Sequence, residues 1–599
     1  MSARPPPVDV RFTNVTYSIP STVKPLSRKR TPPTPILRGV SAYVRAGESL
    51  AILGPSGSGK TSLLNVLAAR TEHPLEAGTV RFAGRRRVPR TKRHIGYVMQ
   101  DDVFFSKLTV RETLQFTADI RLPDTVSKHD KRAAVDDVMH SLRLTKCQHT
   151  RIGDQQFDKG ISGGERKRVN IANELLHSPS LLLADECTSG LDSSSAYTVI
   201  NLLRQLCEEG RTVIATIHQP SSQMFALFDH ILLLAAGRVA YFGPPAKVVE
   251  YFQGIGFPFP THAYNPADYI LELVIDDRTD PCQPDIPSVQ QRILTAWETD
   301  GPQRMADRHL IDMQARSDDE HAPPGNLPQV SPDKYPTNWF SQVFVLGQRA
   351  LRQKRGVLLE PIYIAQLVLV AFIVSMCWFR IDAREGTIED RLGVLSFMPI
   401  FWAFYSTFNA LFAFPAEKQI LNKDRAGGSY RLSAYYFAKT MIETPADTVY
   451  PLFFAAATYF IVGLNPFFLS FLLFTIVLVL NVLTAQSVGL FISAVVMDVR
   501  HAQIVGSIWV LTSMLTAGYY IDPDNVPPFV LPFRVLSFIK VRCIQLYLFT
   551  ARPNSLIVYY QSPSKFFFFF WNNSFCPILD VVWCLQRLFH FLKPFVSTP

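Results

Sequence analysis

The chain has 599 residues, of which 48% are hydrophobic and 18% are charged. That length exceeds one ordinary domain. The net charge of +10 raises the question of a nucleic-acid partner, but no RNA- or DNA-binding motif is present, and many Lys and Arg residues flank apolar stretches, as in membrane proteins. We therefore expect no nucleic-acid partner. Because apolar residues dominate after about residue 357, the sequence predicts a soluble head followed by a membrane body.

The head reads as an α/β domain. Residues 8–19 alternate in a way that is typical of a β-strand, and strands and helices then alternate to about residue 275. We assign residues 1–275 to this first domain. The Pro-rich start of the chain lacks the apolar core of a signal peptide, and the eight cysteines show no metal-binding spacing. We expect the head to be cytosolic.

A composition change follows the head. Residues 276–336 are rich in Asp, Arg, Gln and Pro without periodicity, which predicts a flexible linker. Trp339, Phe340 and Phe344 then recur at helical spacing beside basic residues. This pattern predicts that residues 337–356 form an amphipathic connecting helix on the cytosolic membrane face, with a buried soluble helix as the alternative.

The second half of the chain reads as a membrane domain, which we assign to residues 357–540. Stretches of about 20 apolar residues qualify as membrane spans, and they lie at residues 362–379, 395–414, 440–462, 467–495 and 504–521. The segment before the first span and the loop at residues 417–439 are basic, so both are expected on the cytosolic side.

A phosphate-binding loop lies near the start of the head. Residues 54–61 match G-x-x-x-x-G-K-[ST] between an apolar strand and a helical run. The glycines let backbone N–H groups surround phosphate oxygens, and Lys60 supplies positive charge. The residues expected to bind the phosphates of ATP are Gly54, Ser56, Gly57, Ser58, Gly59, Lys60, Thr61 and Ser62.

Two further segments point to the same chemistry. The apolar run at residues 181–184 ends in Asp185 and Glu186, which places one carboxylate to bind Mg²⁺ and one to polarise the attacking water. Ser162 and Glu165 form an S-x-x-E capping box that predicts a helix start. The alternative interpretation of residues 161–165 is an anion site at that helix terminus.

Together these elements resemble the ATP-binding cassette superfamily, in which the signature segment of one subunit closes over ATP held by the other. The resemblance implies that Glu186, His218 and Gln100 act in hydrolysis, and that Thr61, Gln100 and Asp185 bind Mg²⁺. It also implies a signature segment of Ser162, Gly163, Gly164 and Glu165, and a D-loop of Ser189, Gly190, Leu191 and Asp192. The adenine-stacking position holds Ile19, with Tyr17 two residues earlier.

The cassette-first order is similar to that of the G subfamily of half-transporters, as are the runs at residues 96–102, 108–114, 161–169, 265–269 and 424–439. This resemblance implies a RecA-like α/β core with a β subdomain and a helical subdomain, followed by an all-α membrane domain of the type II exporter kind. It implies that the chain forms a homodimer or a heterodimer with another half-transporter. The dimer is expected to contact membrane lipid, in the plasma membrane or, alternatively, in an internal membrane. A lipophilic lipid, sterol or xenobiotic is the expected substrate, with Tyr405, Ser507, Leu511 and Met514 lining the cavity and Tyr519 and Tyr520 at the outer gate.

The resemblance weakens near the end of the chain. Residues 541–599 form an atypical segment without a clear sixth span, because the apolar run at 566–585 contains Asn572, Asn573, Pro577 and Asp580. We expect an altered or truncated C-terminus. This expectation leaves a second interpretation open, in which the chain is a membrane-tethered regulatory subunit that binds ATP and a partner without transporting anything.

Overall fold

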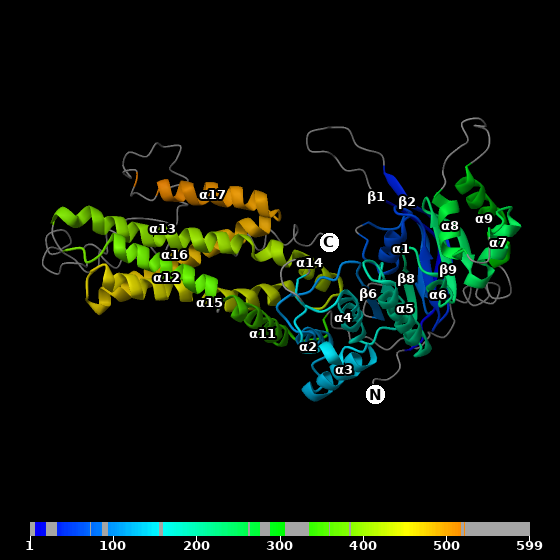
Figure 1. The fold of residues 1–599 in the computed structure, drawn as a ribbon, viewed down its shortest axis with the longest axis horizontal. Coiled ribbons are helices and arrows are strands. Elements are labelled where there is room, and N and C mark those ends of the chain that lie inside the picture. The colour runs from blue at the N-terminus through cyan, green and yellow to red at the C-terminus, as the bar shows by residue number, and fades with distance from the viewer. Residues whose placement is uncertain are drawn as a thin grey trace. The chain divides into compact units, whose positions relative to one another are not determined.

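A computed structural model describes residues 6–19, 33–71, 73–86, 94–154, 160–260, 264–275, 288–305, 335–358, 360–382, 385–516 and 520. The chain divides into two compact units (Figure 1). The first comprises Met1–Val345 together with Asp424–Arg431, and the second comprises Leu346–Lys423 and Leu432–Pro599.

The first unit contains a four-stranded antiparallel sheet in the order β2-β1-β4-β5. Its strands are β1 (Val10–Ile19), β2 (Thr34–Val44), β4 (Ala77–Phe82) and β5 (Arg85–Arg86). The alternation in β1 places Val10, Phe12 and Val15 in the core. The strand expected at residues 8–19 is therefore confirmed.

A six-stranded sheet in the order β10-β9-β3-β8-β7-β6 forms the centre of this unit. Its strands are β3 (Ser49–Leu53), β6 (Ile95–Val98), β7 (Leu181–Ala184), β8 (Thr212–Thr216), β9 (His230–Ala235) and β10 (Arg238–Gly243). Strands β6, β7, β8, β3 and β9 pair in parallel, and β10 pairs antiparallel with β9. Because the strands are almost completely buried apolar runs, helices must cover both faces of the sheet. The segments that follow the parallel strands all start at one edge of the sheet, where ligands bind in open α/β folds.

Helices complete the first unit. They are α1 (Lys60–Leu67), α2 (Val110–Arg121), α3 (Lys128–Ser141), α4 (Gly163–Leu175), α5 (Ser193–Glu208), α6 (Ser222–Phe225), α7 (Val248–Gly254), α8 (Pro266–Ile275) and α9 (Val289–Met305). Short 3₁₀ helices lie at Thr145–Cys147 and Pro245–Lys247. The α/β architecture expected from the sequence is confirmed.

Helix α9 corrects one expectation. Its residues were expected to belong to a flexible linker, yet Ile293, Leu294 and Trp297 are buried against the unit. The Trp297 ring packs on Tyr241 and Tyr251 with centroid distances of 5.9 and 5.6 Å. Residues 276–287 and 306–334 lie outside the described part of the chain. The linker expectation is wrong for α9 because a few apolar residues at helical spacing bury one face of an otherwise polar helix.

The second unit is helical. Its elements are α12 (Pro361–Cys377), α13 (Ile388–Leu411), α14 (Ala413–Ala426), α15 (Leu432–Ile461), α16 (Phe468–Val495), α17 (Val499–Leu515) and a 3₁₀ turn at Glu385–Thr387. Helix α11 (Trp339–Leu358) covers the expected connecting helix, and its Phe340 and Phe344 are exposed. Figure 1 shows the helices of this unit packed side by side along their lengths.

Two helical stretches among the described residues are long and apolar enough to cross a bilayer. One is Glu389–Ala426, which covers α13 and α14, and the other is Phe468–Val495, which is α16. Helix α12 is apolar but has only 17 residues. The first half of α15 carries three charged residues, Lys439, Glu443 and Asp447. The end of the fifth expected span lies outside the described residues. Five spans therefore stay a prediction.

Charged side chains inside the second unit are paired with one another. Lys439 contacts Glu417 at 2.6 Å and Glu443 at 3.3 Å. Lys354 contacts Asp447 at 2.6 Å, and the Gln486 amide donates to the same carboxylate at 3.1 Å. Such pairing is needed wherever charges lie away from water.

A buried ion pair links two helices of the first unit. Arg121, at the end of α2, donates to both oxygens of Glu174 on α4, at 2.8 and 3.1 Å, and the two side chains are only 9% and 3% exposed. Arg121 also donates to the Ser429 hydroxyl at 3.3 Å, so the pair also contacts the segment Asp424–Arg431, which contains the end of α14. Removing one partner of such a buried pair strongly lowers the stability of the fold, because the other charge stays buried without a counter-charge.

We therefore expect Glu174→Ala to destabilise the first unit by about 3–5 kcal/mol, because it leaves the Arg121 guanidinium buried without its counter-ion. The exposed pair of Arg204 and Glu208, at 3.5 Å with 50% and 66% exposure, is the matched control, and Glu208→Ala should cost less than about 1 kcal/mol. Thermal unfolding of the purified full chain ranks the two variants. Equal shifts in melting temperature would contradict the importance of the buried pair.

Candidate nucleotide-binding site

The loop between β3 and α1 has the backbone that phosphate binding requires. Gly54 has φ of +150°, and a Cβ there would lie 2.3 Å from the Leu234 carbonyl oxygen. Gly59 caps α1 with φ of +98°, and a Cβ there would lie 2.8 Å from the Leu37 side chain. Both positions therefore admit only glycine. The loop delivers its N–H groups to the start of α1, where the helix dipole favours an anion.

Two side chains of this loop fit a phosphate group. Lys60 is buried, and its Nζ donates to the Gly54 and Pro55 carbonyls at 2.8 and 2.9 Å. Burial lowers the pKa of Lys60, while the carboxylates of Glu186 and Asp185 oppose that shift. The buried Ser58 hydroxyl has no hydrogen-bond partner among the described residues, and a phosphate oxygen would supply one.

The carboxylate pair lies across from this loop. Asp185 follows β7, and its Oδ1 accepts a hydrogen bond from the Thr61 hydroxyl at 3.2 Å. Hydroxyl and carboxylate oxygens are the ligands that Mg²⁺ prefers, and Mg²⁺ bound with a nucleotide needs only one or two from the protein. The described residues contain no group of three or more His, Cys, Asp or Glu side chains that could hold a metal by themselves. These residues therefore fit Mg²⁺ bound together with phosphate, and the ion would neutralise phosphate charge there.

Gln100 contacts the second acid directly. Its Nε2 donates to Glu186 Oε2 at 2.6 Å, although the two residues are 86 positions apart in the sequence. Signature helix α4 holds the same segment, because Lys167 Nζ donates to the Gln100 carbonyl at 2.9 Å and Asn170 donates to Asp102 at 2.7 Å. Neither α4 side chain was expected from the sequence, where their only signal is two polar residues on a helix face that is otherwise largely apolar.

The signature and D-loop segments are helix starts with exposed tips. Ser162 and Glu165 form a complete capping box on α4, and Asp192 caps α5. The capping interpretation of Ser162 and Glu165 is therefore confirmed, and the anion-site interpretation stays a prediction. The exposed members are Ser162, Gly163, Ser189, Gly190 and Asp192, whereas Gly164 is buried and Glu165 and Leu191 are half-buried.

Three other residues named from the sequence differ in their exposure. His218 follows β8 and is exposed, and within the described residues it makes no hydrogen bond or ion pair. Tyr17 is 7% exposed and points into the core, whereas Ile19 is 46% exposed. Tyr17 therefore cannot stack on a nucleotide base, and Ile19 offers an aliphatic side chain instead.

Comparisons with known proteins agree with this geometry. The ABC transporter family model matches residues 37–189, and ABC-2 type transporter models match residues 341–541 and 218–297. The chain is similar to ABC transporter G family member 22 of Arabidopsis thaliana, with 38% identity over 89% of this chain and 72% of that protein. It is also similar to Protein white of Drosophila melanogaster, with 33% identity over 84% and 73% of the two chains.

A third relative is the broad substrate specificity ATP-binding cassette transporter ABCG2 of Bos taurus, with 31% identity over 95% of this chain and 86% of that protein. The chain belongs to the G family of ABC transporters. It is an integral membrane protein that binds and hydrolyses ATP to drive transport across a membrane. Both the superfamily and the subfamily expected from the sequence are confirmed.

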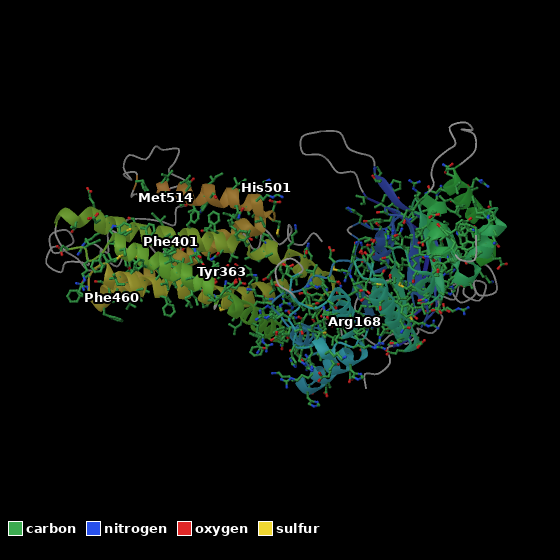
Figure 2. All side chains as sticks on the ribbon, in the orientation of Figure 1. Arg168, Tyr363, Phe401, Phe460, His501 and Met514 are labelled. Carbon is green, nitrogen blue, oxygen red and sulfur yellow. The ribbon has the colours of Figure 1, made fainter. Side chains whose placement is uncertain are left out.

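In this G-family chain, the residues expected to line a substrate cavity do not all share one face of the helical unit. Ser507 and Leu511 on α17 are exposed and Met514 is half-buried; Figure 2 shows Met514 on that helix. Tyr405 instead packs beside Trp402, at a centroid distance of 5.3 Å, and lines a narrow space with residues of α12 and α15. Tyr520 is exposed, and Tyr519 lies outside the described residues.

Glu186→Gln tests the acid that contacts Gln100. The amide keeps the size of the side chain but cannot accept a proton, so we expect ATP turnover to fall by at least about 100-fold while ATP binding is retained. ATPase assays and equilibrium ATP binding on the purified full chain measure the two effects. Turnover near the wild-type rate in this variant would disprove the role of Glu186.

Proposed function

We propose that this chain is an ATP-driven half-transporter that exports lipophilic molecules as a dimer, with two nucleotide sites shared between the subunits. The observation that carries this proposal is the split of the nucleotide machinery. Lys60, Thr61, Asp185 and Glu186 gather at one edge of the sheet, whereas the tip of the signature segment around Ser162 is exposed. A second subunit could therefore supply the missing side of each site.

In the proposed reaction, Lys60 and the loop N–H groups hold the phosphates, and Thr61 and Asp185 hold Mg²⁺. Glu186 accepts a proton from the water that attacks the γ-phosphorus, and the bond to the ADP oxygen breaks. Gln100 is joined to α4 through Lys167, and α4 is joined to the segment Asp424–Arg431 through the Arg121–Glu174 pair. In the proposed mechanism, closure of the nucleotide site shifts Gln100 and α4, and these contacts transmit the shift to that segment.

A complementation experiment tests the shared sites. Lys60→Ala removes the phosphate charge, and Ser162→Arg blocks the signature tip, so neither variant alone should hydrolyse ATP. When both variants are co-expressed, each mixed dimer has one site with an intact Lys60 and an intact partner Ser162. We therefore expect about one quarter of the wild-type ATPase activity if subunits pair at random.

The outcomes separate four arrangements. Recovery in the mixture supports homodimers with shared sites. No recovery, when the wild-type chain alone is active, contradicts sharing. If the wild-type chain is active only when a second G-family half-transporter is added, the functional unit is a heterodimer. An ATP-binding chain that stays inactive with such a partner and moves no substrate is a regulatory subunit, which contradicts the export proposal.

The substrate path is better assigned to Phe404 than to Tyr405. Phe404 is 49% exposed and stacks on Phe408 at a centroid distance of 4.4 Å, and Phe408 packs against the cluster that α13, α16 and α17 share. Leu511 on α17 is exposed as well. We propose that Phe404 and Leu511 contact lipophilic substrate and that Tyr405 supports the helices behind them. The plasma membrane is the proposed location, with the nucleotide unit in the cytosol.

Phe404→Ala should therefore change the relative transport of different lipophilic compounds and leave basal ATPase activity intact, since it removes one exposed ring far in sequence from the nucleotide residues. Tyr405→Phe is the control and should leave transport preferences unchanged. The measurement is ATP-dependent uptake of several apolar dyes and sterols into inside-out vesicles. Altered preferences for Tyr405→Phe together with unaltered ones for Phe404→Ala would reverse the assignment.

A further inference from the structure

We propose that Thr216 is a positioning residue for ATP hydrolysis, whose hydroxyl holds the Asp185 carboxylate and the Glu186 backbone in one arrangement. The inference rests on the proposed roles of those two acids. Thr216 opens the run that contains His218, but no role for its own side chain was expected from the sequence. It is the last residue of β8, two positions before His218.

The Thr216 hydroxyl makes one donated and one accepted hydrogen bond. Its Oγ1 donates to Asp185 Oδ1 at 2.7 Å and accepts from the Glu186 backbone N–H at 2.7 Å. The residue is 0% exposed, so water cannot replace either bond. A hydroxyl has one hydrogen to donate. Here the Thr216 hydroxyl donates that hydrogen to the Asp185 carboxylate, and its oxygen accepts the hydrogen of the Glu186 N–H.

The bond to Glu186 matters because of the backbone there. Glu186 has φ of +43°, a left-handed conformation that non-glycine residues adopt only where the surrounding structure holds them. The Thr216 hydroxyl binds the N–H of this peptide and so restricts its rotation. The direction in which the Glu186 side chain leaves the chain, toward Gln100, follows from that conformation.

The bond to Asp185 matters because few other groups hold that carboxylate. Thr61 reaches the same oxygen at 3.2 Å, and the Tyr97 hydroxyl lies 3.5 Å from Oδ2, a long contact. Since Thr61 is itself expected to bind Mg²⁺, Thr216 makes the short bond that can persist in the loaded site. The neighbouring Ile217 N–H donates to the Ile52 carbonyl at 3.2 Å, so Thr216 also stays aligned with the strand that leads into the phosphate loop.

The test compares Thr216→Val, which keeps the shape and removes the hydroxyl, with Thr216→Ser, which keeps the hydroxyl. The matched control is Thr212→Val on the same strand. Thr212 is also 0% exposed, and its hydroxyl donates to the Val8 carbonyl at 2.6 Å, far from the carboxylates. Both valine variants therefore lose one buried hydroxyl from β8.

Three quantities are measured on the purified full chain: the melting temperature, the ratio of ATP affinity in Mg²⁺ to ATP affinity in EDTA, and the Mg²⁺ concentration that gives half-maximal ATPase activity. For Thr216→Val we expect the affinity ratio to fall by about tenfold and the half-maximal Mg²⁺ concentration to rise by about tenfold, as for the loss of one buried hydrogen bond to a charged group. Thr216→Ser should restore both values to within about twofold of wild type. Thr212→Val should lower the melting temperature and leave both Mg²⁺ values unchanged.

Unchanged Mg²⁺ values in Thr216→Val would overturn the inference, as would equal changes in Thr212→Val, which would mean a general loss of stability. The affinity ratio needs no turnover, so it can be read even where hydrolysis is slow. The proposed site assignment is tested separately by Asp185→Asn. If that variant binds Mg²⁺ with ATP as wild type does, the site assignment itself fails; if it does not and Thr216→Val behaves as wild type, only the role of Thr216 fails.

Discussion

The parallel backbone pairing of β3, β8, β7 and β6 is the constraint on which the nucleotide site depends. Ala184 pairs with Ala215 and Val98, and Thr216 pairs with Ile52. This register places the residues after each strand at a common edge. A shift by one residue would turn each side chain to the opposite face of the sheet, and Asp185 would then point away from Thr61. The catalytic geometry is therefore a consequence of buried main-chain hydrogen bonds between apolar strands.

Helix α4 extends this order away from the sheet. Its Lys167 and Asn170 hold the Gln100 segment, and its Glu174 holds Arg121, which in turn contacts the loop around Ser429. All of these contacts lie within the first unit. A helix that is fixed at both ends by buried polar contacts moves as one body. Helix α4 therefore provides a contiguous packed path between the nucleotide edge and the segment around Ser429. The chain continues from that segment, in both directions, into helices of the second unit.

Much of the nucleotide site could be predicted because its residues stand in short runs whose spacing is set by phosphate geometry. The errors arose where no such spacing applies. Helix α9 was missed because its three buried apolar residues are diluted by polar neighbours. The cavity role of Tyr405 stays a prediction, because α13 carries aromatic residues around most of its circumference, and only packing shows that Phe404 is exposed while Tyr405 lines a space with α12 and α15. Thr216 gave no signal because threonine is common in buried strands.

The contacts of the signature segment bear on the proposal that each nucleotide site needs two chains. In this structure the Ser162 N–H and hydroxyl both donate to Glu165 Oε2, each at 2.9 Å. The negative charge that the start of α4 favours is thus supplied from within the chain. A free anion would have to displace a tethered carboxylate that is already in place, so this helix start alone is a weak anion site. In the proposed dimer, a nucleotide delivered by the phosphate loop of a second subunit would be held by many other contacts, and it could displace Glu165 without relying on the signature for its affinity. The same logic applies to Glu186, whose carboxylate accepts a hydrogen bond from Gln100, so in this structure the carboxylates of Glu165 and Glu186 both have partners within the chain.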